Sequence, residues 1–107
     1  MTVIGTSIIM TRGDTESITV SIKNGAFAYG DTVELTVRRG PNSATKLIHK
    51  VVTEFTDGKA IIPIYPADTG SMQFGRYVYD VQLTRADGTV CTIVKPSGFE
   101  VTAEVTY

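Results

Sequence analysis

The sequence predicts an all-β fold, a sandwich in which two antiparallel sheets pack face to face. Threonine, valine and isoleucine supply 38 of the 107 residues and leucine only three, and this excess of β-branched residues favours strands over helices. Apolar and polar residues alternate in several segments, which are separated by Gly- or Pro-containing turns at intervals of about ten residues. We therefore expect a single domain over residues 1–107 with about seven or eight strands; a small β-barrel is the alternative.

The strands follow from this alternation. In residues 18–23 and again in residues 33–38, each apolar side chain is followed by a polar or charged one, as in a strand with one buried face. The same pattern, or a run rich in β-branched residues between two turns, predicts five further strands at residues 46–54, 59–65, 77–84, 89–94 and 99–106.

Turn residues indicate how these strands connect. Asp57-Gly58 and Asp87-Gly88 supply the positive φ that a tight turn needs, so each predicts an antiparallel hairpin. Residues 66–72 are expected to form one short helical turn, and Pro96-Ser97-Gly98 is expected to separate the last two strands. The predicted arrangement is a meander of short strands.

One segment is loosely similar to a corner found in immunoglobulin domains. It consists of Pro66-Ala67-Asp68-Thr69-Gly70, followed by Tyr77 and Tyr79. In that corner a buried tyrosine donates its hydroxyl to the backbone just upstream, which satisfies its polar end. Residues 71–76 make the spacing longer here. We expect Tyr77 and Tyr79 to be core and corner residues, and the sandwich to be immunoglobulin-like.

Charge and hydropathy exclude several classes of partner. Ten Lys and Arg stand against eleven Asp and Glu, and no basic run is longer than Arg38-Arg39, so no surface suited to a phosphate backbone is predicted. The apolar runs are far shorter than the ~20 residues that span a bilayer. The N-terminus lacks the positively charged start of a secretion signal. We expect no nucleic-acid partner, no membrane partner, and a protein made in the cytoplasm.

Residues able to carry catalysis are few. His49 is the only histidine and Cys91 the only cysteine, so a catalytic relay or a zinc site would lack the partners it needs. We expect His49 to be a surface or half-buried strand residue, Cys91 a small buried hydrophobe, and Asp80 an outward-facing carboxylate. No catalytic residue, cofactor or metal site is predicted, and the chain is predicted not to be an enzyme; a calcium site built across loops is left open.

Arg12-Gly13-Asp14 matches the tripeptide that integrins recognise. Three residues recur often by chance, and Gly13-Asp14 is also an ordinary turn between two strands. We interpret the tripeptide as a turn.

Apolar side chains predicted to lie outside the core are candidates for a binding surface. Residues 61–65 are apolar on both faces, so either Ile61 and Tyr65 or Ile62 and Ile64 face outward. Pro63 lacks an amide donor and therefore predicts an edge strand. Aromatic and Met residues in loops add candidates, because these residue types are enriched at interfaces. The candidate interface residues are Phe27, Tyr29, Ile61, Tyr65, Met72 and Phe74.

Motifs spread over most of the chain carry a resemblance to one family. They are Arg12-Gly13-Asp14-Thr15, Asp31-Thr32-Val33-Glu34-Leu35-Thr36-Val37, Thr56-Asp57-Gly58-Lys59-Ala60, Gly75-Arg76-Tyr77-Val78-Tyr79-Asp80-Val81-Gln82-Leu83, Asp87-Gly88 and Gly98-Phe99-Glu100-Val101. In these motifs the chain resembles small domains from phages and prophages of Gram-positive bacteria, including the N-terminal immunoglobulin-like domain of phage upper baseplate proteins. The resemblance implies a structural module, made in the bacterial cytoplasm and assembled into the virion tail or baseplate. Its expected partners are other phage structural proteins, and it can also form a homo-oligomer.

Two other classes of function stay open. An inhibitor or immunity-type protein would also be a small, neutral binding domain without catalytic residues. A carbohydrate-binding adhesion module would stack exposed tyrosines on sugar rings, although the absence of tryptophan weighs against it.

Overall fold

The computed structural model describes residues 1–4, 6–23 and 25–103 of the chain. Within these residues there are eight strands and one short helix: β1 (Thr2–Ile4), β2 (Ser7–Thr11), β3 (Glu16–Val20), β4 (Thr32–Arg38), β5 (Ile48–Val52), β6 (Ala60–Ile64), α1 (Pro66–Thr69), β7 (Gly75–Thr84) and β8 (Val90–Thr102). The predicted all-β class is therefore confirmed. The end of the last predicted strand, residues 104–106, lies outside the described residues.

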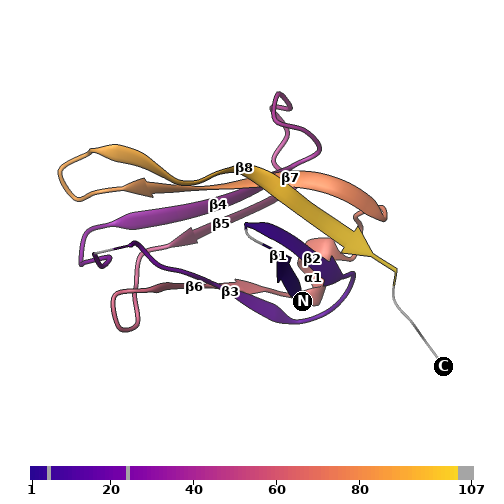
Figure 1. The fold of residues 1–107 in the computed structure, drawn as a ribbon, viewed down its shortest axis with the longest axis horizontal. Coiled ribbons are helices and arrows are strands. Elements are labelled where there is room, and N and C mark those ends of the chain that lie inside the picture. The colour runs from indigo at the N-terminus through magenta and orange to yellow at the C-terminus, as the bar shows by residue number, and fades with distance from the viewer. Residues whose placement is uncertain (5, 24, 104–107) are drawn as a thin grey trace.

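The strands form two sheets that pack as the layers of a sandwich (Figure 1). The larger sheet has the order β1-β2-β8-β7-β4-β5, and the smaller consists of β3 and β6. β8, β7 and β4 thus lie in one layer and β3 and β6 in the other, which confirms the predicted sandwich.

The expectation of wholly antiparallel sheets is wrong at one pair. β2 runs parallel to β8, with Ile8 opposite Phe99 and Thr11 opposite Thr102, whereas the other neighbouring strands that the structure describes are antiparallel. β2 and β8 lie near opposite ends of the sequence, so no turn dictates their relative direction. Their relative direction is decided by the tertiary fold, which places the last strand beside β2.

The core forms where the inner faces of the two sheets meet. Val33, Leu35 and Val37 of β4 are fully buried, as are Ile62 and Ile64 of β6. These side chains recur at every second residue, so one whole face of each strand points inward. The rings of Tyr79 and Phe99 meet edge to face with their centroids 6.2 Å apart, a favourable geometry for two buried aromatic rings.

The connection between β5 and β6 corrects the first predicted hairpin. Asp57 and Gly58 do form a turn with φ values of 52° and 73°, and Thr56 and Lys59 pair across it. However, β5 pairs with β4 and β6 pairs with β3. The turn therefore carries the chain from one sheet to the other, because each strand then buries its apolar face against the opposite layer.

The second predicted hairpin is confirmed, but the strands around it are longer than expected. Thr84 pairs with Val90, and the Arg85 N–H donates to the Thr89 carbonyl at 2.8 Å. The two strands predicted at residues 89–94 and 99–106 are one strand, β8. Register shifts on both sides of Val81 accommodate Pro96 within the pairing, so the chain bulges instead of turning.

The corner before β7 is present and uses Tyr77 as expected. α1 begins at Pro66, a residue suited to the first helical position. The buried Tyr77 donates its hydroxyl to the Gln73 carbonyl, four residues upstream, at 2.6 Å. The Tyr79 hydroxyl donates to the Thr6 carbonyl, and burial raises the pKa of Tyr79. Both tyrosines are thus core residues with a satisfied polar end.

Replacing Tyr77 with Phe is expected to lower the free energy of unfolding by about 1–2 kcal/mol, because the Gln73 carbonyl loses its donor while the ring stays buried. Urea unfolding measures this change. Tyr29→Phe is the control, since the Tyr29 side chain is fully exposed and its loss of a hydroxyl should change stability by less than about 0.5 kcal/mol. Equal effects in the two variants would contradict a structural role for the Tyr77 hydroxyl.

Candidate interaction surfaces

Two of the six predicted interface residues are buried, and their prediction is wrong. Phe27 is 4% exposed and its ring lies 5.2 Å from that of Phe55, centroid to centroid. Met72 is 6% exposed, and its N–H donates to the Thr69 carbonyl. Each of the two side chains covers a different end of the core, because a loop that folds back over a sandwich can bury its apolar side chains.

The other four predicted interface residues are exposed, as expected. Ile61, Tyr65 and Phe74 keep 45%, 53% and 51% of their surface, and Tyr29 is fully exposed. Of the two alternatives for residues 61–65, the structure turns Ile61 and Tyr65 outward and buries Ile62 and Ile64. Pro63 lies on a strand with only one partner in the described part of the chain, which confirms the predicted edge strand.

Ile61, Pro63 and Tyr65 form an outward-facing stripe along β6, here called the β6 stripe. Its neighbours on the same face of the small sheet are Thr19, opposite Ile61, and Ser17, opposite Pro63. Because these polar side chains are small, they do not cover the apolar side chains of the stripe. Beside the stripe, Ile61 and residues 51–56 line a groove of about 460 Å³.

The Tyr65 end of the stripe is fixed by an ion pair. The Lys50 ammonium lies 2.7 Å from Asp68 Oδ2 and 5.1 Å from the centre of the Tyr65 ring. Burial acts to raise the pKa of Asp68, but the Lys50 ammonium and the Tyr65 N–H, which donates to the carboxylate at 2.7 Å, together hold that pKa below its ordinary value. Tyr65 is therefore held in position on the surface.

Phe74 lies at the same end of the sandwich, beside the integrin-like tripeptide. The Arg12 guanidinium sits 4.2 Å from the centre of the Phe74 ring, and the Gly13 N–H donates to Thr69 Oγ1 at 2.9 Å. The Asp14 N–H donates to the Thr11 carbonyl. The tripeptide is the β2–β3 turn, as interpreted from the sequence.

Several strand edges are open among the residues that the structure describes. β3 and β6 pair only with each other, and β5 has a partner on one side only. β2 pairs with β8 only along Phe99–Thr102, so the first part of β8 has no partner strand on that side within the described ranges. Unpaired edges of this kind can accept a strand from another chain.

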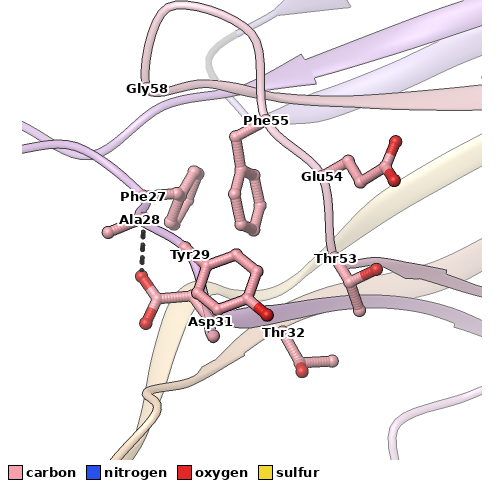
Figure 2. A pocket seen from close by; sticks show the side chains of 10 residues that line it. Phe27, Ala28, Tyr29, Asp31, Thr32, Thr53, Glu54, Phe55 and Gly58 are labelled. Carbon is pink, nitrogen blue, oxygen red and sulfur yellow. Dashed lines mark hydrogen bonds between the residues drawn. The ribbon is translucent and has the colours of Figure 1, made fainter.

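The opposite end of the sandwich carries a pocket of about 680 Å³, here called the loop-end pocket. It lies between the β3–β4 loop and residues 53–58, and Figure 2 shows the rings of Phe27, Phe55 and Tyr29 gathered on one side of it. The side chains of Thr53 and Glu54 line the other side. The Phe27 N–H donates to the Gly58 carbonyl at 3.0 Å, which joins the two loops.

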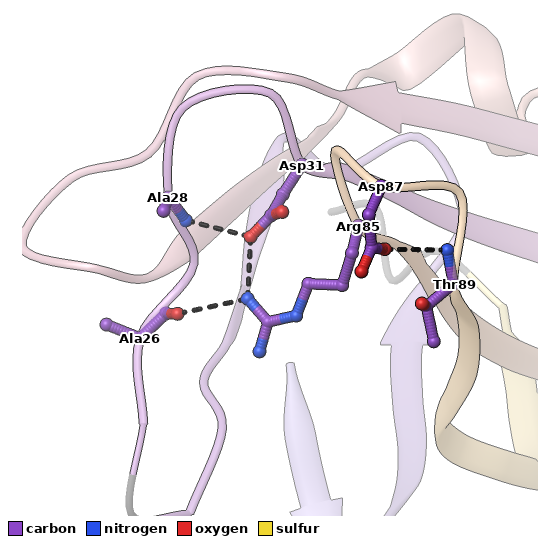
Figure 3. Close-up of polar contacts among 6 residues, drawn as sticks. All are labelled: Ala26, Ala28, Asp31, Arg85, Asp87 and Thr89. Atoms are coloured by element: carbon purple, nitrogen blue, oxygen red, sulfur yellow. Dashed lines mark hydrogen bonds and ion pairs between the residues drawn. The ribbon is translucent and has the colours of Figure 1, made fainter.

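A buried carboxylate fixes the β3–β4 loop beneath this pocket (Figure 3). Asp31 Oδ2 accepts the Ala28 N–H at 2.9 Å and lies 2.8 Å from the Arg85 guanidinium. The Ala28 N–H is the main cause of a lowered pKa at Asp31; Arg85 adds to it and burial opposes it. The neighbouring Asp87 caps the β7–β8 turn, and its pKa is lowered chiefly by the Thr89 N–H.

Sequence reasoning missed Phe55 and the role of Asp31. Phe55 lies in a short segment between strands without alternation, so its ring could not be assigned to core or surface. Asp31 and its partner Arg85 are 54 residues apart, and no local pattern links them. In the sequence, the pair Gly30-Asp31 indicates no more than a turn with a carboxylate in it.

The residues considered for catalysis and metal binding lie apart. His49 is half-exposed on β5, where Nε2 is 3.0 Å from Glu34 Oε2, and Asp80 faces outward beside Arg38 at 3.7 Å. Within the described ranges, no three His, Cys, Asp or Glu residues gather as metal ligands would. The expectation that the chain is not an enzyme stays a prediction.

The expectation for Cys91 is wrong, because this thiol is exposed. Cys91 lies opposite Leu83 on the part of β8 that β2 does not reach. Val90 and Thr92 on either side are exposed too, although Leu83, the partner of Cys91 on β7, is buried.

No helix in the part of the chain that the structure describes is long and apolar enough to cross a membrane. No protein-family model matches the sequence, and no curated protein matches it either.

The Asp31 contacts predict an acid-dependent loss of stability. Because the pKa of Asp31 is lower in the folded chain than its ordinary value of 3.8, this carboxylate stabilises the fold above that value, and the contribution is lost as pH falls through the folded pKa. Asp31→Asn should therefore be less stable at neutral pH and lose less stability between about pH 5 and pH 2. Urea unfolding at several pH values measures both effects.

Arg85→Gln separates the two stabilising contacts of Asp31. The Ala28 N–H remains in this variant, so part of the acid dependence of stability should persist. Asp31→Asn, in contrast, should remove the whole contribution of Asp31 to that dependence. An acid dependence in Asp31→Asn equal to that of the wild type would show that the carboxylate does not contribute.

Proposed function

We propose that this chain is a non-catalytic protein–protein interaction module of a phage or prophage tail or baseplate. The observation that carries the proposal is the β6 stripe, in which Ile61 and Tyr65 are about half exposed on a sheet that has two strands in the described part of the chain. The resemblance to phage baseplate domains supplies the biological setting. The expected partners are other phage structural proteins, and a second copy of the chain is the alternative.

The chemistry of the stripe favours a protein partner. Burying one large apolar side chain stabilises a complex by about 1.5–3 kcal/mol, and tyrosine is a frequent anchor at the centre of interfaces. Ser17 and Thr19 flank the stripe and can donate hydrogen bonds around an apolar contact. The surface thus combines an apolar centre with a polar border, as protein interfaces do.

The open edges beside the stripe support the same proposal. A partner strand that pairs with β3 would add main-chain hydrogen bonds to the side-chain contacts. β3 contains no proline, whereas Pro63 removes one amide donor from β6. The edge of β3 is therefore the better site for strand addition.

Particle incorporation tests the proposal. A tagged copy of the chain, expressed in the lysogen that carries its gene, should appear in particles purified after induction, and Ile61→Lys should reduce its amount by about tenfold or more, because a charge in an apolar contact is strongly unfavourable. The ratio of tagged chain to major capsid protein, measured by quantitative mass spectrometry, gives the result.

Val90→Lys is the matched control, since Val90 is an exposed valine of β8 in the other sheet. It should enter particles as the wild type does, and thermal unfolding should show that both lysine variants are folded. Absence of the wild-type chain from particles would overturn the phage assignment and leave the inhibitor or immunity-type function.

Solution mass decides between a second copy and another protein as the partner. If the stripe joins two copies, light scattering coupled to size-exclusion chromatography should show a dimer in the wild type and a monomer in Ile61→Lys. A monomer at every concentration would exclude self-association and leave a different protein as the partner, either a virion protein or the target of an immunity-type protein.

A further inference from the structure

The walls of the loop-end pocket combine aromatic rings with a carboxylate. Its volume of about 680 Å³ is within the range of sites that bind small molecules or single side chains. The pocket is bounded by two loops that are tied together by the Phe27–Gly58 hydrogen bond and supported by the Asp31–Arg85 pair. These contacts hold the backbone of the two loops in place around the pocket.

Aromatic rings supply one side of the pocket. Phe27 is buried, Phe55 is partly buried with its ring against that of Phe27, and Tyr29 is fully exposed. In Figure 2 the Tyr29 ring is drawn below that of Phe55, and both belong to residues that line the pocket. The face of an aromatic ring carries negative potential and attracts cations.

The charged residues that line the pocket are both acidic. None of the ten lining residues is Lys or Arg, and the two that are charged are Asp31 and Glu54. Asp31 is already paired with Arg85. Glu54 is exposed, and its carboxylate has no hydrogen bond or ion pair within the described residues. An unpaired carboxylate beside aromatic faces favours a positively charged group.

We infer that the loop-end pocket binds the side chain of an arginine presented by the partner protein. A guanidinium is planar, so it can stack on the Tyr29 or Phe55 ring while donating hydrogen bonds to the Glu54 carboxylate, and it is more weakly hydrated than an ammonium group. Thr53 and Thr32, which also line the pocket, offer hydroxyl oxygens as further acceptors. The inference rests on the proposed function, because it names the kind of side chain that a protein partner contributes.

Titration with two small probes tests the inference directly. N-acetyl-arginine amide carries the guanidinium, and N-acetyl-citrulline amide replaces it with a neutral urea group of the same shape. We expect the arginine probe to shift the backbone amide NMR signals of residues 28–32 and 53–56 with a dissociation constant of about 1–10 mM. The dissociation constant of the citrulline probe should be larger than that of the arginine probe by a factor of about five or more.

Variants assign the binding to the pocket. Glu54→Gln should weaken arginine binding about threefold or more and leave citrulline binding unchanged, whereas Tyr29→Ala should weaken both probes. Glu100→Gln is the control, because Glu100 does not line the pocket. Its carboxylate lies on β8 in the larger sheet, where it pairs with Arg76. The dispersion of the amide signals reports whether each variant is folded.

Three results would overturn the inference. They are no shift at about 20 mM arginine probe, equal binding of the two probes, or shifts produced by methyl glucoside and not by arginine, which would make the pocket a sugar site. The titration is independent of particle incorporation. A chain that enters particles but does not bind arginine overturns only the pocket, and a chain that binds arginine but is absent from particles overturns only the proposed function.

Discussion

The packing of the two-stranded β3–β6 sheet against the larger sheet is the interaction on which the rest of the structure depends. It buries Ile62 and Ile64 of β6 against Val33, Leu35 and Val37 of β4. Side chains alternate between the faces of a strand, so burying Ile62 and Ile64 forces Ile61 and Tyr65 to the outside. The core and the β6 stripe are therefore two consequences of one register, and a shift by one residue would exchange them.

The two ends of the sandwich are closed in different ways. At the α1 end, hydrogen bonds from Tyr77 and Gly13 hold the loops against the core, and Met72 fills the space beneath. At the other end, the Asp31–Arg85 pair joins the β3–β4 loop to the β7–β8 turn, while Phe27 and Phe55 cover the core. The pocket at this second end has about 680 Å³, and one at the α1 end, lined by Met72 and Tyr77 among others, has about 200 Å³.

The β6 stripe and the loop-end pocket belong to one continuous surface. Thr53, Glu54 and Phe55 line both the pocket and the groove that reaches Ile61. A partner that covers the stripe thus has the pocket within reach, where an apolar contact and a charged contact would act together. Such a combination gives affinity through the buried apolar groups and selectivity through the charge.

The sequence by itself determined the all-β class, the inner and outer faces of the main strands, the Asp87-Gly88 hairpin and the corner at Tyr77. Each depends on residues close in the chain, whose alternation or turn chemistry acts locally. Only the tertiary structure decided which strands pair, that β2 runs parallel to β8, that Phe27 and Met72 are buried and that Cys91 is exposed. It also brought Asp31 to Arg85 and Phe27 to Phe55. These outcomes depend on which distant segment covers a side chain, and a local pattern carries no information about that.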